Sequence, residues 1–207
     1  MIFDNVILSF DLIGTAASAV AATILAQRKG LDYFGALLIG AVAAVGGGTV
    51  RDLLLNKHPV FWLVKPIYLL VIVSSVTVTL FFYRYINKME KPLRVFDAVG
   101  LAAFTVIGVE IALLKGMSPF IAVIMGVITS TFGGISRDII CNEIPLVLHK
   151  EIYITASIVG SCCLLLLMHL ELHRPVAFSA ALAVIFSVRM IAVYKDLRLP
   201  RFHQIDD

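Results

Sequence analysis

Apolar runs recur along the chain at nearly regular intervals, and polar residues gather in the short stretches between them. Each run is close to the roughly 20 residues that an α-helix needs to cross the hydrocarbon core of a bilayer. Seven runs occur, at about residues 5–26, 32–55, 61–83, 95–114, 118–140, 152–170 and 176–194. They leave too few residues for a soluble domain, so the pattern predicts an all-α membrane protein with seven transmembrane helices in a single membrane domain, 1–207.

Composition and loop charge agree with a membrane protein and predict its orientation. The chain is 60% hydrophobic and 15% charged, with a mean hydropathy of +0.97, whereas soluble domains are about half apolar and about a quarter charged. Basic residues mark cytoplasmic loops. Ten of them fall on one side and four on the other: Arg28, Lys29, Arg84, Lys88, Lys91, Arg94, Lys150, Lys195, Arg198 and Arg201 against Lys57, Lys65, Lys115 and Arg174. This distribution predicts an outside N-terminus and a cytoplasmic C-terminus, and it explains the net charge of +3 without nucleic-acid binding.

The first half of the chain is repeated in the second half at an offset of 86 residues. Of the 50 positions in 10–59, 18 are identical to their counterparts in 96–145. The identities include aligned Gly, Asp, Arg, Asn and Pro, which a shared apolar bias would not produce. Each copy, 5–83 and 91–170, holds three apolar runs. Because three is odd, the second copy enters the membrane from the opposite side, which predicts an inverted 3+3 repeat with one additional C-terminal helix, 176–194.

Each copy carries a glycine motif and an adjacent Arg-Asp pair inside an apolar run, "VGGGTVRDLL" at 45–54 and "TFGGISRDII" at 131–140. Glycine weakens a helix by roughly 1 kcal/mol relative to alanine, and a charged residue at bilayer depth costs roughly 2.5–3.5 kcal/mol. Interrupted helices at corresponding places in inverted halves indicate a substrate or ion site. We therefore expect a break in each helix and a charge pair near each mouth of a pathway. The residues concerned are Gly46, Gly47, Gly48, Gly133 and Gly134 at the breaks, and Arg51, Asp52, Arg137 and Asp138 at the mouths.

Two further acidic residues, Asp11 and Asp97, are repeat mates. An intramembrane charge needs a partner, so we expect cross-helix pairs of Asp11 with Arg51 and of Asp97 with Arg137, either as structural staples or as part of the pathway. Arg189, in the last apolar run, is expected to extend its side chain to the interface.

Other polar residues are weaker candidates for a pathway lining. Glu110 has no acidic repeat mate and either faces the pathway or lies near the outer interface. The hydroxyls of Thr49, Ser130 and Ser136 lie close to the glycine motifs and could hydrate a pore wall.

The paired GGGxxRD and GGxxRD motifs, the 3+3+1 plan and the chain length resemble the prokaryotic members of the trimeric intracellular cation channel family, whose domain has also been labelled a bacterial glycine-transporter or uncharacterised membrane domain. The resemblance implies a homotrimer in a prokaryotic inner membrane, with a pore for monovalent cations, chiefly K⁺, in each protomer. It also implies that the second and fifth helices are kinked at the glycine motifs and line that pore. Phe132 stands where its mate is Gly46, so the two motifs are unequal.

Two functions follow from these expectations. The first is a weakly selective channel for K⁺ and also Na⁺, in which backbone carbonyls freed at the breaks help to coordinate the ion. The alternative is a secondary transporter for a small zwitterion such as glycine, because inverted repeats with broken helices are also a transporter plan. An enzyme is not expected, since His58 and His149 lack a nucleophile, base or metal ligand at a suitable spacing. We expect no cofactor and no tightly bound metal; the ligands considered are permeant K⁺ and Na⁺ and bound lipid.

Overall fold

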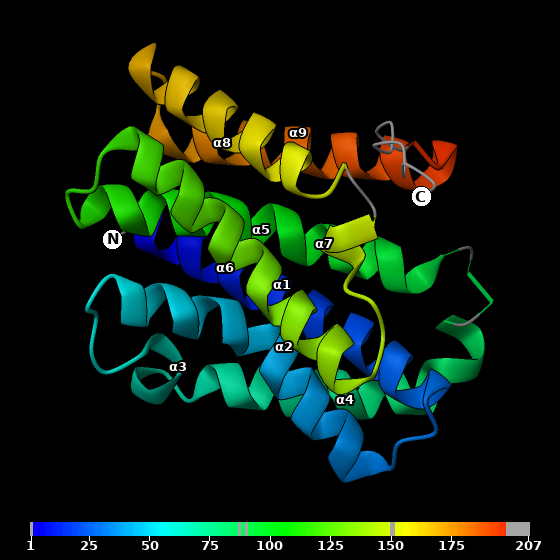
Figure 1. Cartoon of the computed structure of the whole chain (residues 1–207). Coiled ribbons are helices and arrows are strands. Elements are labelled where there is room, and N and C mark those ends of the chain that lie inside the picture. Colours follow the sequence, from blue (N-terminus) through cyan, green and yellow to red (C-terminus); the bar gives the residue numbers. More distant parts are fainter. Residues whose placement is uncertain (1, 87, 90, 150–151, 198–207) are drawn as a thin grey trace, which may run out of the picture.

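The computed structural model describes residues 2–86, 88–89, 91–149 and 152–197, and all the regular structure in these ranges is helical. Seven long helices are joined by short connections that contain two one-turn helices (Figure 1). The elements are α1 (Ile2–Arg28), α2 (Tyr33–Leu54), α3 (Phe61–Val64), α4 (Ile67–Ile86), α5 (Pro92–Leu114), α6 (Pro119–Ile140), α7 (Leu146–His149), α8 (Ile154–His169) and α9 (Arg174–Lys195). Six of the long helices have the length and composition to cross a membrane, and α8 is apolar but shorter, at 16 residues. The predicted all-α membrane fold is confirmed.

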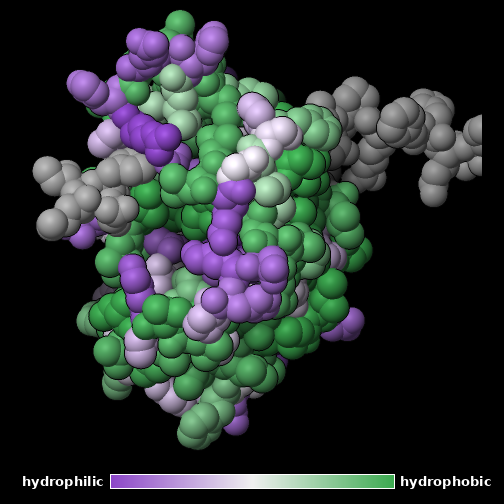
Figure 2. Space-filling model, turned by 90° about the vertical axis from the view of Figure 1, so that its left-hand side faces the viewer, coloured by the Kyte–Doolittle hydropathy of each residue, from purple (hydrophilic) through white to green (hydrophobic). Residues whose placement is uncertain are grey.

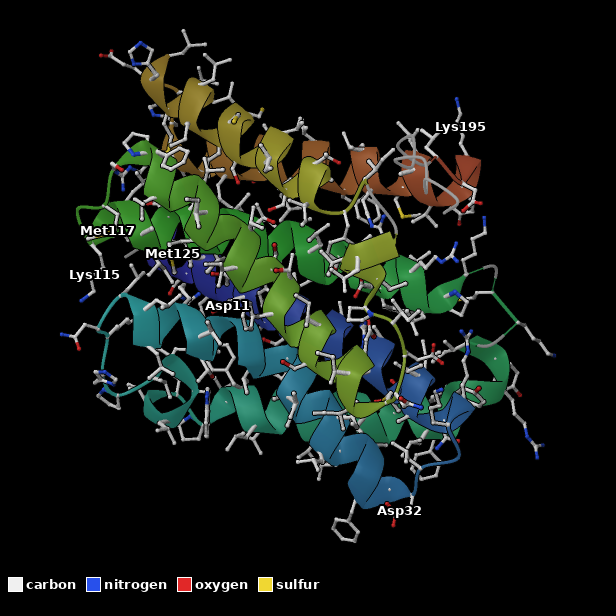
Figure 3. The ribbon with its side chains drawn as sticks, viewed as in Figure 1. Asp11, Asp32, Lys115, Met117, Met125 and Lys195 are labelled. Carbon is white, nitrogen blue, oxygen red and sulfur yellow. The ribbon has the colours of Figure 1, made fainter. Side chains whose placement is uncertain are left out.

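The long helices run between two ends of the molecule. The left-hand end in Figure 1 holds the N-terminus, α3 and the turns α5–α6 and α8–α9; the right-hand end holds the turn α1–α2, the connection α4–α5 and the end of α9. Lys115 lies at the first of these ends, and Asp32 and Lys195 lie at the second (Figure 3). The two three-helix copies therefore cross in opposite senses, as an inverted repeat requires. The sidedness predicted from loop charge stays a prediction, and Lys150, Arg198 and Arg201 lie outside the described residues.

Corresponding turns of the two copies have the same backbone conformation. The turn after the first helix of each copy contains a glycine in the left-handed region, Gly30 with φ 70° and Gly116 with φ 75°. The next helix then begins at a side-chain cap: Asp32 accepts from the Gly35 N–H at 2.7 Å, and Ser118, its repeat mate, caps α6 in the same way. Such caps satisfy donors that a helix start leaves unpaired, so the internal repeat is also a structural one.

The run expected at 61–83 is divided into α3 and α4, because Pro66 lacks the N–H that a continuous helix would use. The segment before α3 and its counterpart before α7 both begin with an asparagine in the left-handed region, Asn56 with φ 48° and Asn142 with φ 52°. In each copy the second helix thus ends abruptly and is followed by a short helix, α3 or α7, that packs against it. These short helices bring backbone N–H groups close to the Arg-Asp pairs.

Four helices, α1, α2, α5 and α6, form the centre of the bundle, and α5 is the most buried of the candidate spans. Glycines at repeat-related positions allow α1 and α5 to cross closely. A Cβ placed on Gly14 would lie 2.8 Å from the Cβ of Ala103, and one placed on Gly100 would meet the Oγ of Ser18. Small residues of this kind let membrane helices approach at backbone distance.

Candidate functional site

The two glycine motifs form the crossing of α2 and α6. A Cβ on Gly47 would collide with the carbonyl oxygen of Thr129, and a Cβ on Gly133 would collide with that of Ala43. Gly46 lies against the same crossing, because a Cβ there would be 3.6 Å from the Cα of Gly133. Both helices continue through the motifs, although α2 changes direction along its length (Figure 1). The expected interruption of the helices is therefore wrong: the glycines serve close backbone contact between them.

The first mouth consists of Asp11, Arg51, Asp52, Phe61 and Tyr68. Arg51 Nε donates to Asp52 Oδ1 at 2.9 Å, and the other oxygen of Asp52 accepts from the Phe61 N–H at 2.9 Å. Tyr68 donates from its hydroxyl to Asp11 at 2.6 Å. Arg51 and Asp52 are almost fully buried. A buried charge is tolerated when it is paired and hydrogen-bonded. The charges of Arg51 and Asp52 can therefore stay buried in this mouth.

The second mouth consists of Asp97, Arg137, Asp138, Leu146 and Tyr153. Arg137 donates to two carboxylates, to Asp97 through Nη1 at 2.9 Å and to Asp138 through Nε at 2.8 Å. Asp138 also accepts from the Leu146 N–H at 3.0 Å, as its mate accepts from the return helix of the first copy. Tyr153 lines the same cavity as Asp97 and Arg137. The two mouths thus share one plan at opposite ends of the α2–α6 crossing.

One of the two expected cross-helix ion pairs is confirmed, that between Asp97 and Arg137. The expected pair of Asp11 with Arg51 is wrong, because among the described residues the hydrogen-bond partner of Asp11 is Tyr68 and the guanidinium of Arg51 is held by Asp52. The tyrosines were missed by the sequence analysis. The sequence does contain a signal for the two tyrosines, because each stands near the start of the third helix of its copy. They are 85 residues apart, one fewer than the repeat offset, so a gap-free alignment does not match them.

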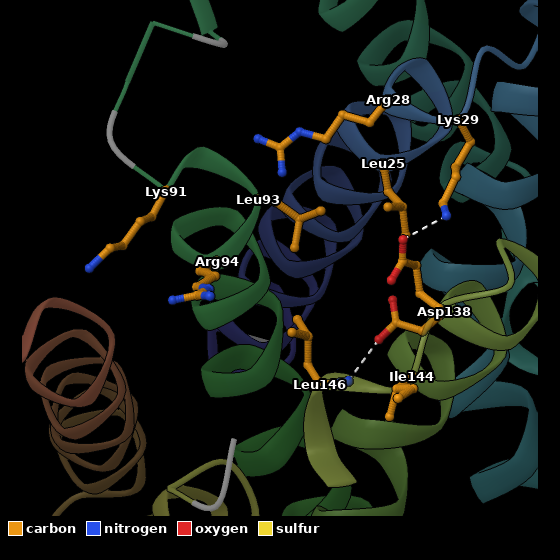
Figure 4. A pocket seen from close by; sticks show the side chains of 10 residues that line it. Leu25, Arg28, Lys29, Lys91, Leu93, Arg94, Asp138, Ile144 and Leu146 are labelled. Carbon is orange, nitrogen blue, oxygen red and sulfur yellow. Dashed lines mark hydrogen bonds and ion pairs between the residues drawn. The ribbon is translucent and has the colours of Figure 1, made fainter. Parts of the chain in front are cut away.

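A vestibule adjoins each mouth. The first has a volume of about 380 Å³ and the second about 560 Å³. Their linings are related by the repeat, as shown by the mates Ile7 and Leu93, Leu8 and Arg94, Leu25 and Ile111, and Lys57 and Glu143. Hydrophilic side chains gather at the centre of the end face that carries the first mouth, with hydrophobic ones around them (Figure 2). In the second vestibule Lys29 pairs with Glu143 at 2.6 Å (Figure 4).

A small cavity lies between the helices beside the crossing, with a volume of about 10 Å³. Its lining includes Ser130, Gly133, Gly134, Asp97 and Arg137. A cavity of roughly 10–15 Å³ holds a single water molecule, so a hydrated cation does not fit here. Among the described residues, Asp97 Oδ2 and Arg137 Nη2 have no hydrogen-bond partner; a water bound in this cavity would supply one. The conformation described is closed at this level.

The remaining hydroxyl candidates lie in different surroundings. Thr49 donates to the Val45 carbonyl at 2.7 Å and accepts from the indole N–H of Trp62 at 3.1 Å, so it links α2 to α3. Ser130 lies 3.5 Å from the hydroxyl of Ser157 on α8. Ser136 is half-buried on α6.

Two further charged residues, Glu110 and Arg189, have their contacts in different parts of the bundle. Glu110 is buried and accepts from Arg174, in the first turn of α9, at 2.9 Å. It therefore joins the seventh long helix to α5 rather than either mouth. Arg189 is 2% exposed and its guanidinium lies 4.5 Å from the ring centroid of Tyr153. The expectation that Arg189 extends to the interface is wrong, because its side chain is buried and lies over Tyr153 of the second mouth.

Comparisons with known proteins agree with this fold and repeat. The family model described as "Glycine transporter" matches residues 8–84 and 94–169, two segments that start 86 residues apart (94 − 8). The UPF0126 inner membrane protein YadS of Escherichia coli (strain K12) is 40% identical over 199 residues, which cover 93% of this chain and 94% of that protein. A UPF0126 membrane protein of Vibrio cholerae is 40% identical over 193 residues, covering 93% and 81%.

Solved structures give the same assignment. The trimeric intracellular cation (TRIC) channel orthologue from Rhodobacter sphaeroides has a TM-score of 0.88 and 40% identity, and the match covers 93% of this chain and 99% of that one. A structure from work on conductance through TRIC cation channels has a TM-score of 0.87 and 33% identity over both full chains. Fold and site therefore define an inverted-repeat membrane protein of the class that includes channels and transporters. The chain belongs to the prokaryotic trimeric intracellular cation channel family, whose shared domain carries the description "Glycine transporter".

Proposed function

We propose that this protein is a channel for monovalent cations, K⁺ and also Na⁺, with a pore in each protomer. The pore runs from the first mouth to the second between α1, α2, α5 and α6, with α2 and α6 lining its narrowest part. The observation that carries this proposal is the pair of repeat-related vestibules, one at each end of the glycine crossing. Similarity to solved TRIC cation channels at 40% and 33% identity supports it.

The charges at the mouths suit a cation pathway because each arginine is neutralised locally. Arg51 and Arg137 are both held by carboxylates, and the second has two of them. A neutralised guanidinium repels a passing cation far less than a free one would in the low dielectric of the bundle. The vestibules, at 380 and 560 Å³, have the volume to admit hydrated ions to these pairs.

Conduction requires the small cavity beside the crossing to widen. The oxygen atoms available there to a partly dehydrated ion are hydroxyls and carboxylates, including Thr129, Ser130 and Asp97. The backbone carbonyls of α2 and α6 belong to continuous helices, so the carbonyl coordination expected from broken helices has no basis in this conformation. Strong K⁺ over Na⁺ discrimination relies on rings of carbonyl ligands, and we therefore expect weak discrimination.

The assembly that we propose is a homotrimer in the inner membrane of a prokaryote. The Rhodobacter sphaeroides protein is described as a trimeric channel, and the Escherichia coli relative is named an inner membrane protein. Large apolar side chains on α4, among them Leu70, Phe81 and Phe82, are exposed and suit contact with lipid or a neighbouring protomer. The N-terminus outside and C-terminus inside follow from loop charge.

A carrier for glycine is not favoured. The broken helices that such a carrier was expected to have are continuous here, and the similar solved structures are those of channels.

Measurement of ion flux in liposomes tests the choice between a channel and a carrier. Purified protein should pass K⁺, and Na⁺ at a comparable rate, in proportion to the applied potential and without saturation. Gly47→Leu should abolish this flux, while Leu53→Ala, at an exposed position on the same helix, should not. Saturable glycine counterflow without K⁺ flux would contradict the proposal.

A further inference from the structure

The surroundings of one pair of repeat mates, Gly48 and Gly134, differ between the two mouths. A Cβ placed on Gly48 would lie 2.5 Å from Cε1 and 3.0 Å from Cζ of Phe61. A Cβ placed on Gly134 would have no neighbour closer than 3.6 Å, the hydroxyl of Tyr153. The space that an aromatic ring fills at the first mouth is therefore open at the second, where Gly134 lines the small cavity.

Phe61 is held in this position from several sides. Its ring centroid lies 5.4 Å from the guanidinium carbon of Arg51 and 4.7 Å from the ring centroid of Tyr68, which meets it edge-on at 89°. Its N–H donates to Asp52 at 2.9 Å. Phe61 also lines the first vestibule. The ring thus lies between that vestibule and the glycine face of α2.

The helix that carries Phe61 is short, and its contacts with the bundle come from its first two residues. α3 is four residues long and none of its residues is buried. Leu63 and Val64 are exposed, and the connection of α3 to α4 contains Pro66. Phe61 and Trp62 pack against a cluster of buried residues that includes Val45 and Ile72, and the Trp62 indole donates to Thr49. Moving α3 therefore requires the contacts of these two residues to break, while the long helices α2 and α4 keep their own contacts.

From these contacts we propose that Phe61 is the gate residue of the first mouth. With its ring on Gly48, Phe61 closes the route from the first vestibule to the α2–α6 crossing, and the route opens when α3 carries the ring away. At the second mouth Leu146 makes the corresponding backbone hydrogen bond without an aromatic ring, so the gate belongs to one copy only. This inference rests on the proposed cation pore.

Single-channel recording of the purified protein in symmetric KCl tests the gate. Phe61→Ala removes the cation–π and aromatic contacts and keeps the N–H to Asp52, so its open probability should exceed the wild-type value by about tenfold. Leu63→Ala, on the exposed side of the same short helix, is the matched control and should behave like wild type.

Gly48→Ala is an independent route to the same result, because its Cβ displaces the ring while Phe61 remains. It should raise the open probability as well, and it decides the test if Phe61→Ala does not fold. Trp62, the only tryptophan of the chain, adjoins Phe61 and reports the position of α3. Its quenching by acrylamide should increase in both variants and stay unchanged in Leu63→Ala.

The outcomes separate the gate from the pore. If the wild type conducts cations and neither Phe61→Ala nor Gly48→Ala changes its open probability, the gate is refuted and the channel function stands. If Leu63→Ala raises the open probability as much as Phe61→Ala, α3 acts without a specific role for the ring, which also refutes the gate. If no variant and no wild-type sample conducts cations, the pore and its gate are refuted together.

Discussion

Arg137 lies between two buried carboxylates, and Arg137→Gln is the substitution at the mouths that we expect to destabilise the protein most. Glutamine keeps hydrogen-bond donors but leaves Asp97 and Asp138, 5% and 3% exposed, without a cation. Removing one partner of a buried ion pair costs roughly 3–5 kcal/mol. For a chain of about 200 residues each kcal/mol lowers Tm by about 2–4 °C, so we expect a fall in Tm on the order of 10 °C.

The inverted repeat supplies a matched comparison, Arg51→Gln. This change leaves Asp52 without its cation, but the second carboxylate of the first mouth, Asp11, keeps its hydrogen bond from Tyr68. The fall in Tm should therefore be about half as large. Thermal unfolding of both variants in the same detergent, followed by scattering and tryptophan fluorescence, measures the difference. A Tm of Arg137→Gln within about 2 °C of wild type, or a lower Tm for Arg51→Gln, would refute the reasoning.

Two further predictions concern stability. Gly47→Ala should lower Tm clearly, because its Cβ would meet a backbone carbonyl oxygen. Gly46→Ala should lower Tm little, because the nearest neighbour of its Cβ would be 3.6 Å away. Equal Tm values for the two variants would mean that α2 and α6 do not cross at these glycines. Arg174→Ala should be more destabilising than Glu110→Gln, because only the former leaves a buried carboxylate unpaired, and the double variant should recover most of the loss. Thermal melts of the three proteins would contradict this if the double variant were the least stable.

Much of the fold can be predicted from the sequence because its determinants are local or periodic. The lengths of the seven apolar runs reflect the thickness of the bilayer. The repeat at an offset of 86 residues is visible because equivalent positions, such as Asp32 and Ser118, do the same job of capping a helix in each copy. The pairing of Asp97 with Arg137 was also predictable, since a buried charge needs a partner and the repeat places both near one end.

The meaning of the glycines was not predictable in the same way. A run of glycines weakens a helix on its own, but in the bundle Gly47 and Gly133 gain contact with the opposite backbone, and the helices continue. That outcome depends on the partner helix, which the motif does not describe. Arg189 is a similar case, because its burial over Tyr153 follows from the packing of α8 against α9.

The tyrosines of the two mouths were hidden by a small shift in register. Tyr68 and Tyr153 are 85 residues apart, one fewer than the repeat, so an alignment without gaps does not pair them. The place of Phe61 at the first mouth was hidden because neither Val147, its mate at the offset of 86, nor Leu146, which makes the corresponding hydrogen bond, is aromatic. To recognise the tyrosines and Phe61 as members of the mouths, one needs the positions of the short helices α3 and α7, which appear only in the folded chain.

The most direct test of a cation pore through the glycine crossing is planar-bilayer recording of the purified protein in asymmetric KCl, with the double variant Gly47→Leu, Gly133→Leu beside it. Discrete current steps that reverse near the K⁺ equilibrium potential and disappear in the double variant are the result that we predict. A silent wild type that catalyses saturable glycine counterflow in liposomes would contradict the account and would make the crossing part of a carrier.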